Sequence, residues 1–150
     1  FKHPTPSDFL RVMEVQSDLE LDWYFEYWVN STKHIDYGID TLIAKGKSTK
    51  IVLERIGQMP MPLDVRVELK DGTVYNYNIP LTIMRGNKPA EYENTEVKAD
   101  WPWTHPTYTL VVDAKMNKIA SVQIDPSGRM ADIRLKNNVF PSPEEEESEN

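Results

Sequence analysis

In residues 21–30 the polar side chains recur with the period of an α-helix. Asp22, Glu26 and Asn30 are spaced four residues apart and form one narrow polar stripe. The rest of the helix surface is apolar and carries five aromatic side chains: Trp23, Tyr24, Phe25, Tyr27 and Trp28. A packed ring buries about 150–250 Å². We therefore expect the helix to sit in a substantial core or to dock on a large body that this chain lacks, with the five rings as candidates for packing against that body. Because rings lie on both flanks of the helix, we also expect the isolated chain to expose an apolar patch of several hundred Å² around Trp23 and Tyr27.

Two helix-start signals lie in the first twenty residues. Thr5, followed by Pro6 and then by Asp8, has the residue types of an N-cap and a first helical turn. Ser17 and Glu20 have the Ser-x-x-Glu spacing of a capping box directly before the aromatic segment. The pattern predicts two short helices, the second of which ends at about residues 29–31.

Beyond residue 37 the period changes from that of a helix to that of a strand. Short runs rich in β-branched and aromatic residues alternate with Gly, Pro, Asn and Asp. The turn signals are Asp71-Gly72 and Asp125-Pro126-Ser127-Gly128. The predicted strands are 39–44, 50–56, 65–69, 74–79, 108–113, 119–124 and 133–135. About seven strands joined in this way predict an immunoglobulin-like antiparallel β-sandwich, preceded by two short α-helices.

These patterns divide the chain into three parts. Residues 1–36 form a helical segment, the end of a helical domain, and residues 37–140 form the β-sandwich. Residues 141–150 contain five glutamates and no large apolar side chain, which predicts a disordered acidic tail. The opening residues Phe1-Lys2-His3-Pro4 read as the interior of a longer polypeptide, so we expect an excised segment.

Charge and apolarity narrow the expected partners. The tail supplies five of the seven net negative charges, so the rest of the chain is nearly neutral. Because there is no run of Lys and Arg, we expect no nucleic-acid partner. No apolar run approaches the roughly 20 residues that cross a bilayer, so we expect no membrane span.

The residue types that carry catalysis are poorly represented. There is no cysteine, no Gly-rich phosphate loop and no Gly-x-Ser-x-Gly motif. The histidines His3, His34 and His105 lack metal-ligand spacing. Asp22 and Glu26 could form an acid/base pair, but we expect solvated helix charges instead. The sequence therefore predicts no catalytic, cofactor-binding or metal-binding residue.

Trp101-Pro102-Trp103 and Tyr108 allow two interpretations. Exposed rings on a sandwich loop stack on sugar rings, which would make Trp101, Trp103 and Tyr108 the site of an autonomous carbohydrate- or peptide-binding module. In the alternative interpretation one tryptophan covers the core while Pro102 and Pro106 fix the loop.

Two groups of motifs resemble the zinc metallopeptidases of the aminopeptidase N type, the M1 family. The first group resembles the end of the catalytic helical region: His3-Pro4-Thr5-Pro6, Asp8-Phe9, Leu21-Asp22-Trp23-Tyr24-Phe25, Trp28 and Ile35-Asp36-Tyr37. The second resembles the β-sandwich that follows it in bacterial members: Gly57-Gln58-Met59-Pro60-Met61-Pro62, Asp71-Gly72, Met84-Arg85-Gly86-Asn87-Lys88, Trp101-Pro102-Trp103 and Asp125-Pro126. Together they span most of the chain except the acidic tail.

The resemblance implies a role without chemistry for this chain. The family binds zinc through a His-Glu-x-x-His helix and a downstream Glu, and recognises the substrate amino terminus through a Gly-x-Met-x-Asn strand; neither motif is present. The chain would be a non-catalytic C-terminal structural and docking module. Its partner would be the catalytic domain of the same polypeptide, which would hold the zinc and the peptide substrates. Family habit also points to an exported or periplasmic protein.

Overall fold

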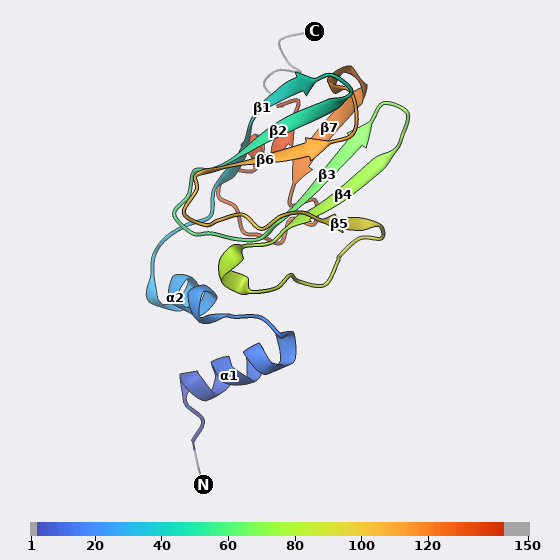
Figure 1. The fold of residues 1–150 in the computed structure, drawn as a ribbon. Coiled ribbons are helices and arrows are strands. Elements are labelled where there is room, and N and C mark those ends of the chain that lie inside the picture. The colour runs from blue at the N-terminus through green and yellow to red at the C-terminus, as the bar shows by residue number, and fades with distance from the viewer. Residues whose placement is uncertain (1–2, 143–150) are drawn as a thin grey trace.

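Two short helices lie at one end of a two-sheet β-sandwich in the computed structural model, which describes residues 3–142 (Figure 1). The helices are α1 (Pro6–Ser17) and α2 (Asp22–Asn30). The strands are β1 (Tyr37–Lys45), β2 (Ser48–Arg55), β3 (Leu63–Leu69), β4 (Val74–Ile79), β5 (Thr95–Val97), β6 (Thr107–Val112), β7 (Ile119–Ile124) and β8 (Val139–Phe140). This confirms the predicted fold class, mainly β with N-terminal helices. The immunoglobulin-like connectivity stays a prediction, and residues 143–150 of the predicted tail lie outside the described residues.

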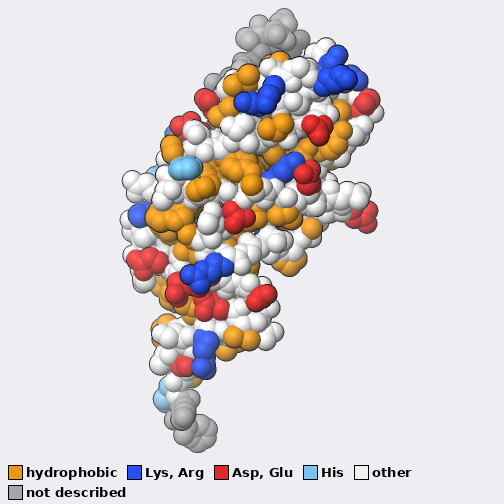
Figure 2. Space-filling view, viewed as in Figure 1, with side chains coloured by type: hydrophobic (Ala, Val, Ile, Leu, Met, Phe, Trp, Pro, Cys, Tyr) orange, Lys and Arg blue, Asp and Glu red, His pale blue; other side chains and the backbone are white. Residues whose placement is uncertain are grey.

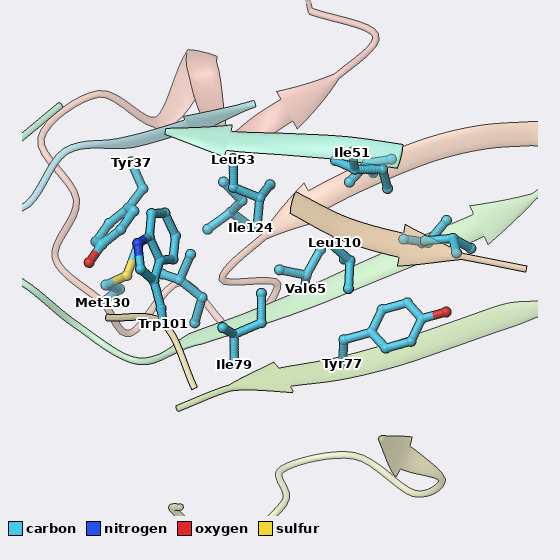
Figure 3. Close-up of a cluster of buried hydrophobic side chains, with 14 of the residues drawn as sticks. Tyr37, Ile51, Leu53, Val65, Tyr77, Ile79, Trp101, Leu110, Ile124 and Met130 are labelled. Carbon is cyan, nitrogen blue, oxygen red and sulfur yellow. The ribbon is translucent and has the colours of Figure 1, made fainter. Parts of the chain in front are cut away.

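The two sheets pack face to face. One has the strand order β1-β2-β6 and the other β5-β4-β3-β7-β8. Apolar side chains from both sheets fill the space between them, as the close-up in Figure 3 shows: Ile51, Leu53 and Leu110 from the first, and Val65, Ile79 and Ile124 from the second. The alternation that predicted a half-buried strand in β3 is confirmed, because Val65, Val67 and Leu69 are buried.

The β3–β4 hairpin turns where the sequence predicts it. Gly72 has φ +85°, a conformation that costs glycine little. The Asp71 side chain accepts a hydrogen bond from the Thr73 backbone N–H at 3.0 Å. The Gly72 backbone conformation and the Asp71–Thr73 hydrogen bond set the register of β3 against β4.

The last part of the sandwich differs from the prediction. Residues Ile133–Leu135 do not form a strand, because the Asp132 carboxylate accepts backbone N–H bonds from Tyr37 and Arg134, both at 2.8 Å, and turns the chain. A 3-10 helix (Leu135–Asn138) follows, and only then the short strand β8. The sheet containing β4 is also mixed, since β5 pairs with β4 in parallel.

The start of α1 has the predicted capping box. The Thr5 hydroxyl accepts a hydrogen bond from the Asp8 backbone N–H at 3.3 Å, and the Asp8 carboxylate accepts one from the Thr5 N–H at 2.8 Å. These bonds, the one from the Thr5 side chain first, lower the pKa of Asp8. Thr5 and Asp8 therefore set the first turn of the helix.

The second predicted capping box is wrong. Ser17 is the last residue of α1, and its hydroxyl donates to the Met13 carbonyl at 2.8 Å. Asp18 then adopts a left-handed conformation with φ 55° and ends the helix. The cap position of α2 is Leu21, which makes no side-chain capping bond.

Candidate docking surface

Neither helix contains a buried residue, although both are rich in large apolar side chains. On α2, Trp28 is 43% exposed and Tyr24 is 40% exposed. On α1, Phe9 is 60% exposed. Hydrophobic and acidic side chains share the surface of this helical part of the molecule, as Figure 2 shows for one face. We call the exposed apolar side chains of the two helices the outer surface: Phe9, Val12, Met13, Val15, Tyr24, Trp28 and Val29.

A neighbouring face of α2 and the residues just before this helix contact the sandwich. Leu19, Trp23 and Tyr27 are half-buried and pack against the hydrophobic core. The Trp23 indole N–H donates to the Glu20 carbonyl at 2.7 Å, and the Lys33 ammonium lies 4.8 Å from the centre of the Tyr27 ring. The predicted location of the patch around Trp23 and Tyr27 is therefore wrong. These two rings face the sandwich.

The exposed rings of α2 form a continuous group. Tyr24 meets Trp23 edge-on with 5.7 Å between ring centres, and the Trp28 ring is tilted against Tyr24, also with 5.7 Å between centres. Phe25 is half-buried. The five predicted packing residues thus differ in exposure: Trp23 and Tyr27 pack against the core, Phe25 is partly covered, and Tyr24 and Trp28 are exposed.

Carboxylates border the outer surface. Oxygen atoms of Glu14, Glu20 and Asp22 lie within 4.8 Å of one another. Glu14 also accepts a hydrogen bond from the Leu21 backbone N–H at 3.0 Å. Carboxylates are hard ligands that suit Ca²⁺ or Mg²⁺, but exposed acidic groups of this kind are common without an ion. The trio therefore gives the border a negative charge and does not by itself define a metal site.

The other candidate acid/base and metal residues are at the surface. Asp22 and Glu26 are both exposed, and Glu26 accepts a hydrogen bond from the Asn30 side chain at 2.9 Å, as expected for helix-surface charges. His3, His34 and His105 are also exposed. Within residues 3–142, no group of three potential metal ligands includes a histidine.

The three rings of the alternative carbohydrate site do not form a platform. Trp101 is 1% exposed and its indole N–H donates to the His105 carbonyl at 2.9 Å. Its ring contacts Tyr37 edge-on at 5.5 Å and the tilted ring of Tyr108 at 5.3 Å between centres. Only Trp103, at 39%, is well exposed. Trp101 belongs to the core, so the interpretation that one tryptophan covers the core is confirmed and the three-ring stacking site is wrong.

The junction between helices and sandwich is held by buried polar contacts. The Asp36 carbonyl accepts hydrogen bonds from the backbone N–H groups of Ile56 and Gly57, both at 2.8 Å. The Asp36 carboxylate accepts one from the Asn137 side chain at 2.9 Å. The neighbouring Tyr37 hydroxyl bonds to Met61, and burial raises the pKa of Tyr37 to about 12. The chain therefore enters the sandwich in a defined conformation.

A surface depression of about 570 Å³ lies between the β1–β2 hairpin and residues 115–119. Lys115 is the one ionisable residue among those that line it. The depression lacks the convergent polar groups typical of a small-molecule site.

None of the helices among residues 3–142 has the length and apolar character needed to cross a bilayer.

Comparison with known proteins leaves the family open. Family models, curated proteins and solved structures were each searched, and none of the three searches gave a match.

Proposed function

We propose that this chain is a non-catalytic C-terminal structural and docking module of a zinc-dependent, M1-like aminopeptidase. Its partner is the catalytic domain of the same polypeptide, which holds the zinc and the peptide substrates. The proposal is supported by the motifs that resemble this family and by their order along the chain. The proposal also includes an immunoglobulin-like connectivity of the sandwich. The module itself contributes packing and orientation to the whole enzyme.

The outer surface is the observation that carries the proposal. Helices of 12 and 9 residues are marginal in water without tertiary packing. α2 obtains that packing on one side only, through Trp23 and Tyr27, and α1 buries no residue. Trp28 and Phe9 remain exposed, although rings of this size stabilise a fold mainly when they are covered. A second apolar body on the outer surface supplies the missing cover.

Binding to the rest of the proposed polypeptide tests this function. The region encoded upstream in the same reading frame would be produced as a separate chain and titrated calorimetrically with residues 1–150. We expect a Tyr24→Ser/Trp28→Ser double variant to bind about 100-fold more weakly, because central aromatic anchors dominate interface energies.

Trp103→Ser is the matched control, since Trp103 is also an exposed tryptophan but lies on the sandwich. It should bind like the unaltered chain. Absence of binding by the unaltered chain, or equal losses in the helix variant and the control, would refute the proposed docking surface.

A further inference from the structure

The segment between β4 and β5 contacts both the sandwich and the linker between α1 and α2. We call residues 85–94 the strap; it follows a 3-10 helix (Thr82–Met84) and leads into β5. The Met84 carbonyl, directly before the strap, accepts a hydrogen bond from the Glu20 backbone N–H at 2.9 Å. Gly86 lies against Leu19, since a Cβ at Gly86 would be 3.0 Å from a Leu19 methyl carbon. The start of the strap therefore supports the residues that lead into α2.

Lys88 ties the strap to the sandwich. Its ammonium pairs with the Asp64 carboxylate on β3 and with Glu91 Oε1 at 2.8 Å. Asp64 is buried, and its other oxygen accepts a hydrogen bond from the Asn78 side chain at 2.8 Å. A buried carboxylate that loses its paired cation destabilises the folded state. The Lys88–Asp64 pair therefore favours a single position of the strap.

The Lys88 ammonium is suited to an ion pair and not to nucleophilic catalysis. Burial alone would lower the pKa of Lys88, but the hydrogen bonds to Asp64 and Glu91 raise it above its ordinary value. A nucleophilic lysine needs the opposite shift. The adjoining cavity, of about 120 Å³, is also smaller than the pockets that bind small molecules.

The second half of the strap has separate contacts with the same sheet. The Arg66 guanidinium lies 4.6 Å from the centre of the Tyr92 ring, and the Asn76 side chain donates to the Glu93 carbonyl at 3.3 Å. The first half of the strap comprises residues 85–89. Among the described ion pairs, only that of Lys88 with Asp64 connects this half to a strand. The part of the strap beside the helices thus depends on Lys88.

We infer that Lys88 is a positioning residue: its ion pair with Asp64 holds the strap so that Met84 and Gly86 fix the start of α2, and with it the orientation of the outer surface. This inference depends on the proposed function only for what the outer surface binds. The link from Lys88 through the strap to Glu20 is a property of the isolated chain. It connects the start of α2 to β3 of the sandwich.

Hydrogen exchange at the Glu20 amide, measured by NMR on the isolated chain, tests the inference. In Lys88→Met we expect this amide to exchange about tenfold faster relative to the β3 amides, because the strap opens locally without unfolding the sandwich. Because a lone buried Asp64 could destabilise the whole chain, the double variant Asp64→Asn/Lys88→Met removes both charges and should show the same local effect. Lys88→Arg should keep the Glu20 rate near that of the unaltered chain.

Lys98→Met is the matched control, since Lys98 likewise forms an ion pair, to Glu96 at 2.6 Å, but lies outside the strap, directly after β5. It should leave the Glu20 rate unchanged. An unchanged Glu20 rate in both Lys88 variants would overturn the inference. So would an equal acceleration of the β3 amides in the double variant, which would show a merely structural role. Neither result depends on whether the upstream polypeptide binds.

Discussion

Trp101→Ala should cost about 3–5 kcal/mol of unfolding free energy, the largest loss expected from any single ring in this chain. Trp101 is 1% exposed and packs between Tyr37 and Tyr108. Removing the indole leaves a cavity and also leaves the His105 carbonyl without its donor. Urea unfolding followed by circular dichroism measures the change.

Trp103→Ala provides the comparison, because Trp103 is exposed and two residues away. Its loss should stay below about 0.5 kcal/mol, as is usual for surface substitutions. Similar losses in both variants would contradict the assignment of Trp101 to the core. A much larger loss for Trp103 would show that the loop residue has an unrecognised structural role.

Gly57→Ala is expected to destabilise the junction between helices and sandwich by about 1–3 kcal/mol. A Cβ at Gly57 would lie 2.6 Å from both the Asp36 backbone nitrogen and the His34 carbonyl oxygen, so the backbone itself must move. The same urea titration measures the loss.

Gly86→Ala is its control. There the nearest atom is the end of the flexible Leu19 side chain at 3.0 Å, which can shift at little cost. A loss below about 1 kcal/mol is expected. If Gly57→Ala proved as mild as Gly86→Ala, the junction would be looser than its hydrogen bonds indicate.

The aromatic helix was predictable from its period, but the orientation of its faces was not. The spacing of Asp22, Glu26 and Asn30 identifies the polar stripe. The remaining surface is apolar all round, so periodicity gives no reason for Trp23 and Tyr27 to face the sandwich while Tyr24 and Trp28 stay exposed. That choice depends on the path of the linker, a tertiary feature.

At the end of α1, the sequence is compatible both with the start of a new helix at Ser17 and with the end of the preceding helix there. Ser17 has the residue type and spacing of an N-cap, yet it bonds back to Met13 as part of the preceding helix. The left-handed Asp18 ends α1 instead, and an Asp in that conformation has no distinct sequence signature. The structure therefore keeps the two predicted helices but moves the boundary between them.

Long-range polar contacts explain the errors after residue 130. Ile133 and Leu135 alternate like a strand, but both are exposed, because Asp132 directs the chain through its bonds to Tyr37 and Arg134. Tyr37 is 95 residues away in the sequence, beyond the range of any local pattern. The short strand β8 depends on pairing with β7, which is also distant in the sequence.

The Lys88 ion pairs were missed for the same reason. Asp64, Asn78 and Lys88 come from two strands and a loop and show no spacing that marks a site. The Trp101-Pro102-Trp103 motif was more informative, since one of its two interpretations placed one tryptophan in the core. The sequence alone did not show whether Trp101 or Trp103 is the buried one.

The central proposal is that the outer surface of α1 and α2 is covered by the catalytic domain of the proposed longer polypeptide. Hydroxyl-radical footprinting with mass spectrometry compares the isolated chain with the polypeptide that also contains the upstream region. We predict severalfold lower modification of Met13 and Trp28 in the longer protein, with Trp103 and Met116, which are exposed on the sandwich, modified equally in both. Equal modification of Met13 and Trp28 in the two proteins would contradict the claim.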